Sequence, residues 1–303
     1  MKKTRASESL RGLLKQIKEQ LKAAGIDNPV SSAELIIAEA LGIQRPQIYL
    51  QPERKPSPSQ LRKIRNWARE RARRKPFEYI VGKAWFREIE LLVTPEVLVP
   101  RPETELLVEQ ALKLIRADAQ IQKILDLGTG SGAIILSLAH ELKKYPRQIQ
   151  FFASDLSKPA LKLAMKNASR LGLKSKINFQ PGHLFQPFPR RKFNLIICNP
   201  PYIPTNELPK LMPEVAKYEP RIALDGRKDG IHLIRQLLAQ APAYLVPAGY
   251  LLLEIGKGQA AKVKNLSSPH LHLQKLAKDY SNIDRIALFQ LRLCGLADSK
   301  QKS

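Results

Sequence analysis

The sequence contains few cysteines, few acidic residues and no long apolar run, and each shortage excludes a class of protein. With only Cys198 and Cys294 in 303 residues, neither a disulfide framework nor a cysteine-rich zinc site is available, so we expect a reducing, cytoplasmic location and no site metal. No apolar run is long enough to cross a bilayer. The basic segment 1–5 lacks the apolar stretch of a signal peptide, so we expect no contact with a membrane.

Acidic residues number 27 against 51 lysines and arginines, which gives a formal net charge of +24. A charge of this size predicts attraction to polyanions such as ribosomal or transfer RNA. The basic residues are spread through the chain, so a solvated basic surface without a nucleic-acid partner is an equal alternative. Hydrophobic residues make up 44% of the chain, which is enough to bury the core of one large or two modest domains.

The first 80 residues carry a helical pattern. Apolar residues recur at helical spacing from residue 8 to residue 24, and a further helix is expected from about Ser59 to Arg73. Between them, Ser31 and Glu34 resemble a capping box that opens a second helix. No catalytic constellation lies in this region. We predict that residues 1–80 form a small helical bundle that docks a partner, with a purely structural appendage as the alternative.

Short apolar runs replace the helical pattern between residues 81 and 100. The runs 84–86, 89–93 and 97–99 predict a β-hairpin linker that turns near Thr94 and Pro95. The segment Pro100 to Glu105 follows, where prolines and acidic side chains are typical of the first turn of a helix.

A strand, a glycine-rich loop and a helix are then expected in succession. Residues 123–127 predict a buried parallel strand, and the loop 128–132 after it contains three glycines, which permit a tight turn and close approach of a ligand to the backbone. Gly128, Gly130 and Ala133 also fit the dinucleotide fingerprint, so a nicotinamide enzyme remains an alternative.

Asp155 ends the next expected strand, at a position where a carboxylate can accept hydrogen bonds from both hydroxyls of a ribose. A structural role for Asp155 as the cap of the helix 158–171 is the alternative. Further strands are expected at 177–180, 193–197, 250–255 and 286–293, which predicts a doubly wound α/β domain with a mostly parallel sheet over residues 101–295. The charged segment 204–220 is expected to form a lid, and 296–303 a disordered tail.

Asn199, Pro200, Pro201 and Tyr202 come directly after the expected strand 193–197. Two successive prolines forbid a helix and hold the chain extended, so the Asn199 amide and nearby main-chain carbonyls face outward as acceptors. Tyr202 adds an aromatic wall. An acceptor pair beside a flat ring suits a planar NH2 group, either a carboxamide or the exocyclic amine of a base. A plain proline-rich turn is the alternative.

These motifs, in this order and at these strand ends, resemble those of class I S-adenosylmethionine-dependent methyltransferases. More closely, residues 75–293 resemble the HemK/PrmC family of release-factor glutamine N5-methyltransferases. The likeness rests on Asp126-Leu-Gly-Thr-Gly-Ser-Gly132, Asn199-Pro-Pro-Tyr202, Val99-Pro-Arg-Pro-Glu-Thr-Glu105, Glu219-Pro-Arg-Ile-Ala-Leu-Asp-Gly226 and Leu252-Leu-Glu-Ile-Gly256. The Asn-Pro-Pro-Tyr motif is shared with adenine methyltransferases, whereas the proline-arginine-proline segment is more specific.

The resemblance implies a Rossmann-like domain that uses S-adenosylmethionine to methylate the glutamine of the Gly-Gly-Gln loop in class 1 release factors. The residues that it implies for the cofactor are Gly128, Thr129, Gly130, Ser131, Gly132, Asp155, His183, Leu184 and Asn199. Those that it implies for the substrate amide are Asn199, Pro200, Pro201, Tyr202 and Arg101, with Asn199, Pro200 and Tyr202 as the catalytic set. The family usually has an acid where His183 stands, and an imidazole can also accept from the adenine amine.

We therefore expect a monomeric release-factor methyltransferase, with weak contact to RNA through its basic surface. A DNA or RNA adenine N6-methyltransferase is the first alternative, favoured by the charge and the shared motif but lacking an evident domain of aromatic base platforms. A non-catalytic RNA-binding adaptor is the second, and the intact asparagine and glycines argue against it.

Overall fold

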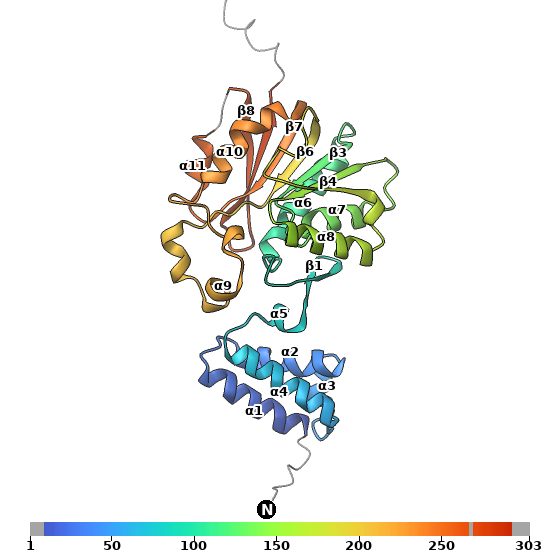
Figure 1. The fold of residues 1–303 in the computed structure, drawn as a ribbon, viewed down its shortest axis with the longest axis vertical. Helices are drawn as coiled ribbons and strands as arrows, with labels where there is room; N and C mark the ends of the chain where they lie inside the picture. The colour runs from blue at the N-terminus through green and yellow to red at the C-terminus, as the bar shows by residue number, and fades with distance from the viewer. Residues whose placement is uncertain (1–8, 267–268, 293–303) are drawn as a thin grey trace, which may run out of the picture. The chain divides into compact units, whose positions relative to one another are not determined.

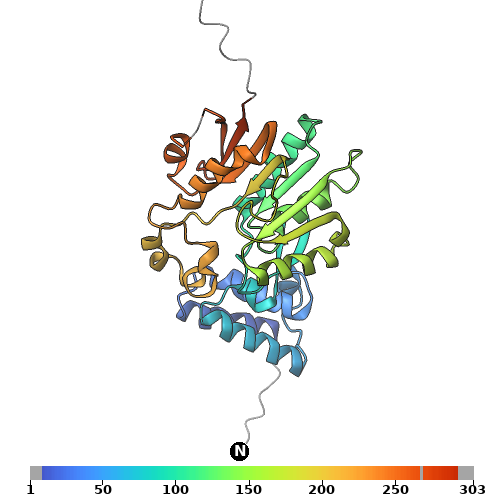
Figure 2. The same cartoon turned by 45° about the horizontal axis from the view of Figure 1, so that its top comes forward.

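The computed structural model describes residues 9–266 and 269–292. It divides into two compact units (Figures 1 and 2): a helical unit of the residues up to Lys83 with Met212–Tyr218, and an α/β unit of Ala84–Leu211 with the residues from Glu219 onward. The tail expected at 296–303 lies outside the described residues, as does Cys294. In the described ranges, no helix has the length and apolar character that a membrane span requires.

In the helical unit, α1 (Leu10–Ala23), α2 (Pro29–Leu41) and α4 (Pro58–Ala72) lie side by side (Figures 1 and 2). The shorter helices are α3 (Pro46–Leu50), α5 (Phe77–Val81) and α9 (Pro213–Tyr218). Helix α1 buries one apolar stripe because its large aliphatic residues recur every three or four positions. These residues are Leu10, Leu13, Ile17 and Leu21. The helical character predicted for the first 80 residues is confirmed.

The second helix begins earlier than predicted. Helix α2 starts at Pro29, where the missing N–H costs nothing because the first turn of a helix has no partner for it. Glu34 does not form a capping box with Ser31; its carboxylate is buried and accepts hydrogen bonds from Arg45 and Tyr49. The Glu34 side chain, which the local pattern assigned to the start of α2, is instead hydrogen-bonded to residues farther along the chain.

In the α/β unit, seven strands of the described residues form one sheet, in the order β5-β4-β3-β6-β7-β9-β8. Strands β3 to β7 are parallel, and β9 is antiparallel to both β7 and β8. The bounds are β3 (Lys123–Leu127), β4 (Gln150–Asp155), β5 (Ile177–Pro181), β6 (Phe193–Cys198), β7 (Leu245–Glu254), β8 (Leu271–Lys278) and β9 (Asp284–Leu291). The predicted doubly wound, mostly parallel sheet is confirmed. The strand order reverses between β3 and β6, where such sheets bind their ligands.

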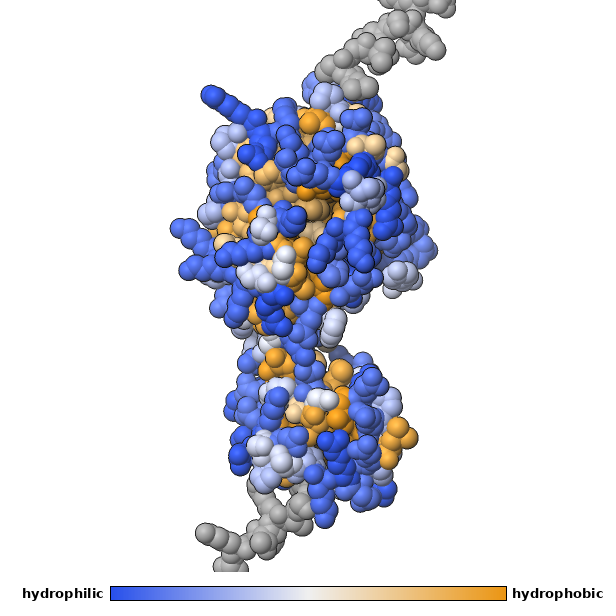
Figure 3. All heavy atoms as spheres, turned by 90° about the vertical axis from the view of Figure 1, so that its right-hand side faces the viewer, coloured by the Kyte–Doolittle hydropathy of each residue, from blue (hydrophilic) through white to orange (hydrophobic). Residues whose placement is uncertain are grey.

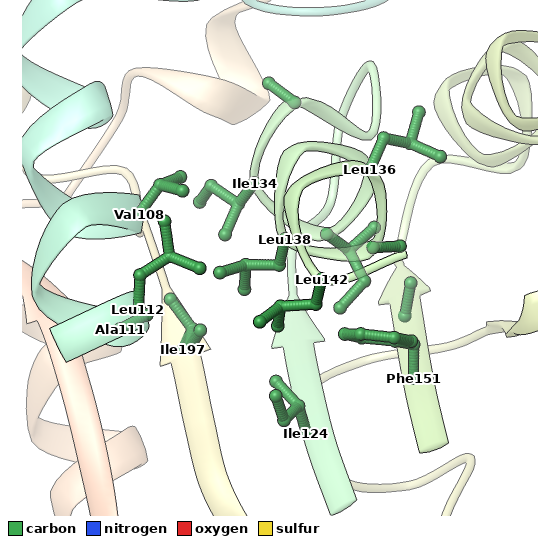
Figure 4. Close-up of a cluster of buried hydrophobic side chains, with 14 of the residues drawn as sticks. Val108, Ala111, Leu112, Ile124, Ile134, Leu136, Leu138, Leu142, Phe151 and Ile197 are labelled. Atoms are coloured by element: carbon green, nitrogen blue, oxygen red, sulfur yellow. The ribbon is translucent and has the colours of Figure 1, made fainter. Parts of the chain in front are cut away.

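Helices cover both faces of this sheet. Helices α6 (Pro102–Ala117), α7 (Ala133–Glu141) and α8 (Lys158–Arg170) lie on one face and α10 (His232–Gln240) on the other, near the short α11 (Ala260–Lys264) (Figure 1). Successive residues of a strand point to opposite faces, so β6 sends Ile197 to the first core and Ile196 to the second. In Figure 4, Leu112 of α6 and Leu138 of α7 pack above Ile197. The buried apolar layers hold the carboxyl ends of β3 and β6 in register.

Strand β8 has no counterpart among the strands predicted from the sequence. Its alternation of apolar and polar residues is broken by register shifts between Leu273 and Lys275 and between Ala277 and Lys278. It also lies at the edge of the sheet, where few of its side chains are buried. A half-exposed, bulged strand carries little of the periodic signal by which strands are recognised.

The β-hairpin turns earlier than predicted. Strands β1 (Lys83–Phe86) and β2 (Ile89–Leu92) flank a turn whose first residue, Arg87, has a φ of 50°. The apolar run 97–99 is not a strand. Prolines at 95 and 100 flank this run and cannot donate to a ladder, which explains why pairing stops at β2. Leu92 of β2 instead exchanges two hydrogen bonds with the side chain of Asn167 on α8, at 2.8 and 3.0 Å.

Candidate active site

A cavity of about 510 Å³ lies at the carboxyl ends of β3, β4 and β6. The predicted site residues that line it are Arg101, Gly128, Thr129, Gly130, Ser131, Asp155, His183, Leu184, Asn199, Pro200 and Pro201. Gly132 and Tyr202 are not among the described residues that line it. Positions about a hundred residues apart in the sequence meet because the parallel strands all end at the same edge of the sheet.

The glycine loop after β3 has two parts with different roles. Gly128 and Gly130 have φ angles of 70° and 56°, and a Cβ added to either would meet nothing within 4 Å. These two glycines therefore keep the loop backbone open toward the cavity. Gly132 has a φ of 87° at the N-cap of α7, and a Cβ there would lie 2.6 Å from Cδ1 of buried Leu136. Gly132 serves the packing of the helix start instead of lining the cavity.

Asp155 accepts two backbone hydrogen bonds, from the Gly130 N–H on Oδ2 and from the Ser157 N–H on Oδ1, both at 2.8 Å. Burial raises the pKa of Asp155, and these two hydrogen bonds partly oppose that shift. Each carboxylate oxygen has more than one acceptor position, so the side chain can still accept from hydroxyls in the cavity. The alternative role as cap of α8 is wrong: Ser157 is the N-cap, and its side chain accepts from the Ala160 N–H.

Asp126 belongs to the glycine-loop motif, and its buried carboxyl group has an unusual electrostatic environment. Its carboxyl group is fully buried at the end of β3 and accepts a hydrogen bond of 2.7 Å from Thr129 Oγ1. Burial raises the pKa of Asp126 to about 7, and the nearby charge of Asp155 adds to the shift. A carboxyl residue inside an otherwise apolar strand was the sequence signal for this position.

Asn199 directly follows β6, and its carboxamide is held by a hydrogen-bond chain that runs from a partly buried to a buried bond. Its Nδ2 donates to Thr104 Oγ1 at 3.1 Å, and Thr104 Oγ1 donates to Glu254 Oε2 at 2.7 Å. Glu254 is 1% exposed at the end of β7. No described residue donates to Asn199 Oδ1, and no described backbone N–H donates to the Pro200 carbonyl. These two oxygens are therefore the acceptors that the site offers at the end of β6.

Tyr202 forms its hydrogen bonds with Glu254 and Gln259, and neither of these described residues lines the cavity. Its hydroxyl donates to Glu254 Oε1 at 3.1 Å, and its carbonyl accepts from Gln259 Nε2 at 2.8 Å. Burial raises the pKa of Tyr202, and the charge of Glu254 raises it further. The phenol is therefore a hydrogen-bond donor that holds Glu254, and its contact with a substrate stays a prediction.

Three further predicted residues line the cavity from its walls. Arg101 forms an ion pair with Glu219, whose side chain is 1% exposed. His183 and Leu184 follow Gly182, whose N–H donates to the Asp155 carbonyl and so joins the β4 and β5 ends. None of the described residues 204–220, where a lid was expected, lines the cavity, whereas residues 221–223 do.

Residues 12–82 match the PrmC N-terminal domain and residues 102–213 match the Methyltransferase small domain. A release factor glutamine methyltransferase of Geobacter sulfurreducens is 37% identical over 279 residues, which cover 92% of this chain and 95% of the relative. Another, of Moorella thermoacetica, is 37% identical over 282 residues, which cover 92% of this chain and 98% of the relative. This chain belongs to the release factor glutamine methyltransferase family.

This family member also resembles a solved methyltransferase fold. The catalytic domain of hMettl16, solved in complex with MAT2A 3'UTR hairpin 1, gives a TM-score of 0.53 at 16% identity and covers 67% of this chain and 75% of that chain. An identity this low indicates a shared fold only. Membership of the release factor glutamine methyltransferase family leaves the nicotinamide alternative unsupported.

The cavity of this release factor glutamine methyltransferase family member fits S-adenosylmethionine, its methyl donor. The space beside Gly128 and Gly130 is open to a ligand, as a methionine moiety next to the backbone requires. The carboxylate of Asp155 suits ribose hydroxyls, and Leu184 offers an apolar surface to a base. The residues present therefore match the three chemical parts of the cofactor.

Proposed function

We propose that this protein transfers a methyl group from S-adenosylmethionine to the side-chain amide nitrogen of the glutamine in the Gly-Gly-Gln loop of class 1 peptide-chain release factors. The observation that carries the proposal is the pair of acceptors at the end of β6. Asn199 Nδ2 is occupied by Thr104, which leaves Oδ1 to accept, and the Pro200 carbonyl lies next to it in the chain. Two acceptors on adjacent residues suit the two hydrogens of one carboxamide.

The chemistry of the substrate explains why acceptors are needed. An amide nitrogen is a poor nucleophile because its lone pair is delocalised into the carbonyl. The sulfonium of S-adenosylmethionine supplies an electrophilic methyl group. Hydrogen bonds to Asn199 Oδ1 and the Pro200 carbonyl orient the substrate nitrogen and draw electron density toward it. Alignment and exclusion of water then supply most of the acceleration, and the proton leaves after the transfer.

The proposed roles follow the cavity. Gly128 to Ser131 hold the methionine part of the cofactor, Asp155 its ribose, and His183 and Leu184 its adenine. The substrate side chain is received by Asn199, Pro200, Pro201 and Arg101. Tyr202 either contacts the substrate directly or holds Glu254, which in turn positions the residues that bind the substrate. We propose that residues 1–80 dock the release factor, that 81–100 link the domains, and that 101–295 catalyse, in a monomer in the cytoplasm.

An adenine methyltransferase is the second candidate, because the Asn199 to Tyr202 motif also suits the amine of a base. The relatives that span this chain carry the name release factor glutamine methyltransferase, which favours the protein substrate. The non-catalytic adaptor is not favoured, since the cavity and its acceptors are complete among the described residues.

Contact with RNA is a separate part of the proposal. Hydrophilic side chains cover most of the face drawn in Figure 3. A polar hollow of about 750 Å³ is lined by Lys123 and by the basic run Arg190, Arg191 and Lys192. Lys123 begins β3, whereas the active site lies at the end of that strand. This hollow could attract phosphates without presenting a base to the cofactor.

The experiment that tests the proposed function offers labelled S-adenosylmethionine to a release factor, to DNA and to RNA in parallel. We expect one methyl group on the glutamine of the release factor, located by mass spectrometry, and none with Asn199→Ala. Label on adenine with none on the release factor would replace the proposed function by the second candidate.

A further inference from the structure

We propose that Thr104 and Glu254 are positioning residues that fix which end of the Asn199 carboxamide faces the substrate. Neither belongs to the predicted site residues. Thr104 comes from α6, Asn199 from the end of β6 and Glu254 from the end of β7, and the hydrogen bonds that join them measure 3.1 and 2.7 Å. The inference rests on the proposed function and adds to it the groups that make Asn199 an acceptor.

An asparagine side chain does not hold its own direction. The last torsion of a carboxamide has two broad, nearly equivalent minima, and half a turn exchanges Oδ1 with Nδ2. If Nδ2 faced the substrate amide, two donors would meet and no hydrogen bond would form. Only the orientation with Oδ1 toward the substrate is productive, so something must hold Asn199 in it.

The chain of hydrogen bonds supplies this direction because its end is an obligatory acceptor. An ionised carboxylate can only accept hydrogen bonds, so Thr104 must donate its single O–H to Glu254 Oε2. The Thr104 oxygen is then left with lone pairs alone and can only accept from Asn199. The Asn199 carboxamide must therefore donate from its NH2 group to Thr104, which places Oδ1 on the opposite side.

Buried contacts fix the position of the Glu254 carboxylate. Its side chain is buried, and its second oxygen accepts from the Tyr202 hydroxyl at 3.1 Å. The guanidinium of Arg285 on β9 attracts the carboxylate, while Glu103 on α6 repels it and the buried thiol of Cys198 lies within its field.

The same burial makes the relay sensitive to acid. Burial raises the pKa of Glu254, and the hydrogen bonds from Thr104 and Tyr202 and the charge of Arg285 oppose the rise. A protonated Glu254 becomes a donor, so Thr104 can turn its O–H toward Asn199, and the reversed carboxamide is no longer excluded. Turnover should therefore fall as Glu254 takes up a proton.

The first test is independent of activity and follows the side-chain NH2 of Asn199 by NMR, assigned by its absence in Asn199→Ala. In Thr104→Val we expect the NH2 protons to exchange with solvent at least about tenfold faster than in the wild type, and Thr104→Ser should restore slow exchange. Glu254→Gln should give two sets of Asn199 signals. Asn167 is the internal control, because its Nδ2 donates to the Leu92 and Ser131 carbonyls and none of these partners is substituted.

The second test follows turnover on a release factor. Thr104→Val should lower kcat about tenfold, equivalent to about 1.4 kcal/mol, with KM for either substrate changed less than about twofold. The double variant Thr104→Val/Glu254→Gln should be no slower than the slower single variant, since both cut one relay. The acid limb of the kcat profile should disappear in Thr104→Val.

The outcomes separate the relay from the proposed function. Unchanged NH2 exchange in a folded Thr104→Val, or a loss that Thr104→Ser does not restore, would overturn the relay. A defect confined to KM for S-adenosylmethionine would also overturn it, because Thr104 would then act on the cofactor. If the NH2 exchange follows Thr104 but no release factor is methylated by the wild type, the relay stands and the proposed substrate fails. Should Thr104→Val not fold, Glu254→Gln gives the same decision.

Discussion

Asp155 ends β4 and Asn199 directly follows β6, the two strands on either side of β3. The proposed function assigns Asp155 to the cofactor and Asn199 to the substrate. We predict that Asn199→Ala lowers kcat by more than about tenfold, which is about 1.4 kcal/mol, and leaves the affinity for adenosylhomocysteine unchanged. Asp155→Ala should weaken that affinity first. Calorimetric titration and initial rates measure the two effects. An asparagine variant that kept more than a tenth of the wild-type rate would refute the orienting role.

Asp155→Asn is the matched control for this comparison. It keeps one acceptor oxygen for either the Gly130 or the Ser157 N–H, turns an NH2 group toward the other, and removes the charge. A loss of affinity in Asp155→Ala that Asp155→Asn does not share would therefore show that the charge of the carboxylate is not required.

Asp126 should make the stability of the α/β unit depend on pH. Its folded-state pKa of about 7 lies above the value of 3.8 expected when unfolded, so the folded protein binds the extra proton between these two values. The free energy of unfolding should therefore fall as the pH rises from about 4 to about 7, by up to about 1.4 kcal/mol per pH unit, and stay level above. Asp126→Asn should lack this component. Denaturant unfolding of both proteins across the range measures the difference, and parallel curves would disprove the assignment.

The residues of the site were predictable to different degrees. Asn199, Asp155 and the glycines could be predicted from local signals, because each lies at the end of an expected strand and belongs to a short motif. The relay could not be predicted, because Thr104 and Asn199 are 95 positions apart and Thr104 and Glu254 are 150 positions apart. Their hydrogen bonds exist only once β6 and β7 pair and α6 packs on the sheet. The position of Tyr202 likewise depends on Glu254.

At the scale of elements, the glycine loop between β3 and α7 contains glycines with two different roles: Gly130 lines the cavity, and Gly132 packs against the start of α7. Gly130→Ala and Gly132→Ala both place a side chain at a positive φ, which costs about 1 kcal/mol. We expect Gly132→Ala to destabilise the protein by about a further 1 to 2 kcal/mol, because its Cβ meets buried Leu136. Gly130→Ala should mainly weaken cofactor binding. Equal stabilities of the two variants would show that Leu136 yields to the new methyl group.

Helix α9 belongs to the helical unit, although it follows β6 in the sequence, and Glu214 is one of the residues that contact that unit. The Glu214 carboxylate is nearly buried and pairs with Arg71 at 2.9 Å and Arg74 at 2.8 Å. Burial would raise the pKa of Glu214, but hydrogen bonds from its own backbone and from both arginines lower it. The stabilisation is therefore present above a pH of about 4.5 and is lost as the pH falls below it.

We predict that Glu214→Gln lowers the free energy of unfolding of the helical unit by about 2 kcal/mol at neutral pH. Glu70→Gln is the control and should cost less than about 1 kcal/mol, because Glu70 pairs with Arg73, which is 74% exposed, and at 3.4 Å with Lys75, which is 28% exposed. Hydrogen exchange of the α4 amides at neutral pH and at about pH 3.5 measures both. A Glu214 variant that matches the control would show that α9 is held by other contacts, such as the hydrogen bond of 2.8 Å from the Tyr218 hydroxyl to the Arg73 carbonyl.

Elements were predicted well where a long apolar pattern decided them. The core strands β3, β4 and β6 are largely apolar and are bounded by turns, and their positions agree with those predicted from the sequence. Two errors have different causes. Glu34 pairs with Arg45 instead of capping α2, which is a tertiary contact that overrides a local pattern. The hairpin turns at Arg87 instead of Thr94 because the prolines at 95 and 100 do not continue the pairing. Short signals of one or two residues cannot reveal such competition.

At the scale of the whole molecule, the charge of +24 has to be assigned to docking, to RNA or to solubility. Arg62 and Lys63 are exposed on α4 of the helical unit, and Lys162 and Lys166 are exposed on α8 of the α/β unit. Removing either pair by alanine changes the net charge equally, so the two double variants separate a local docking face from the overall field.

We predict that Arg62→Ala/Lys63→Ala lowers kcat/KM several-fold for an intact release factor and leaves it unchanged for a short Gly-Gly-Gln peptide, because remote contacts deliver the loop to the site. Lys162→Ala/Lys166→Ala should affect both substrates little. Raising the salt to about 0.5 M should shrink the difference between substrates, since exposed charges are screened within a few ångströms at that ionic strength. Equal losses with both double variants would assign the charge to general attraction, and losses on the peptide would place the α4 residues in folding instead of docking.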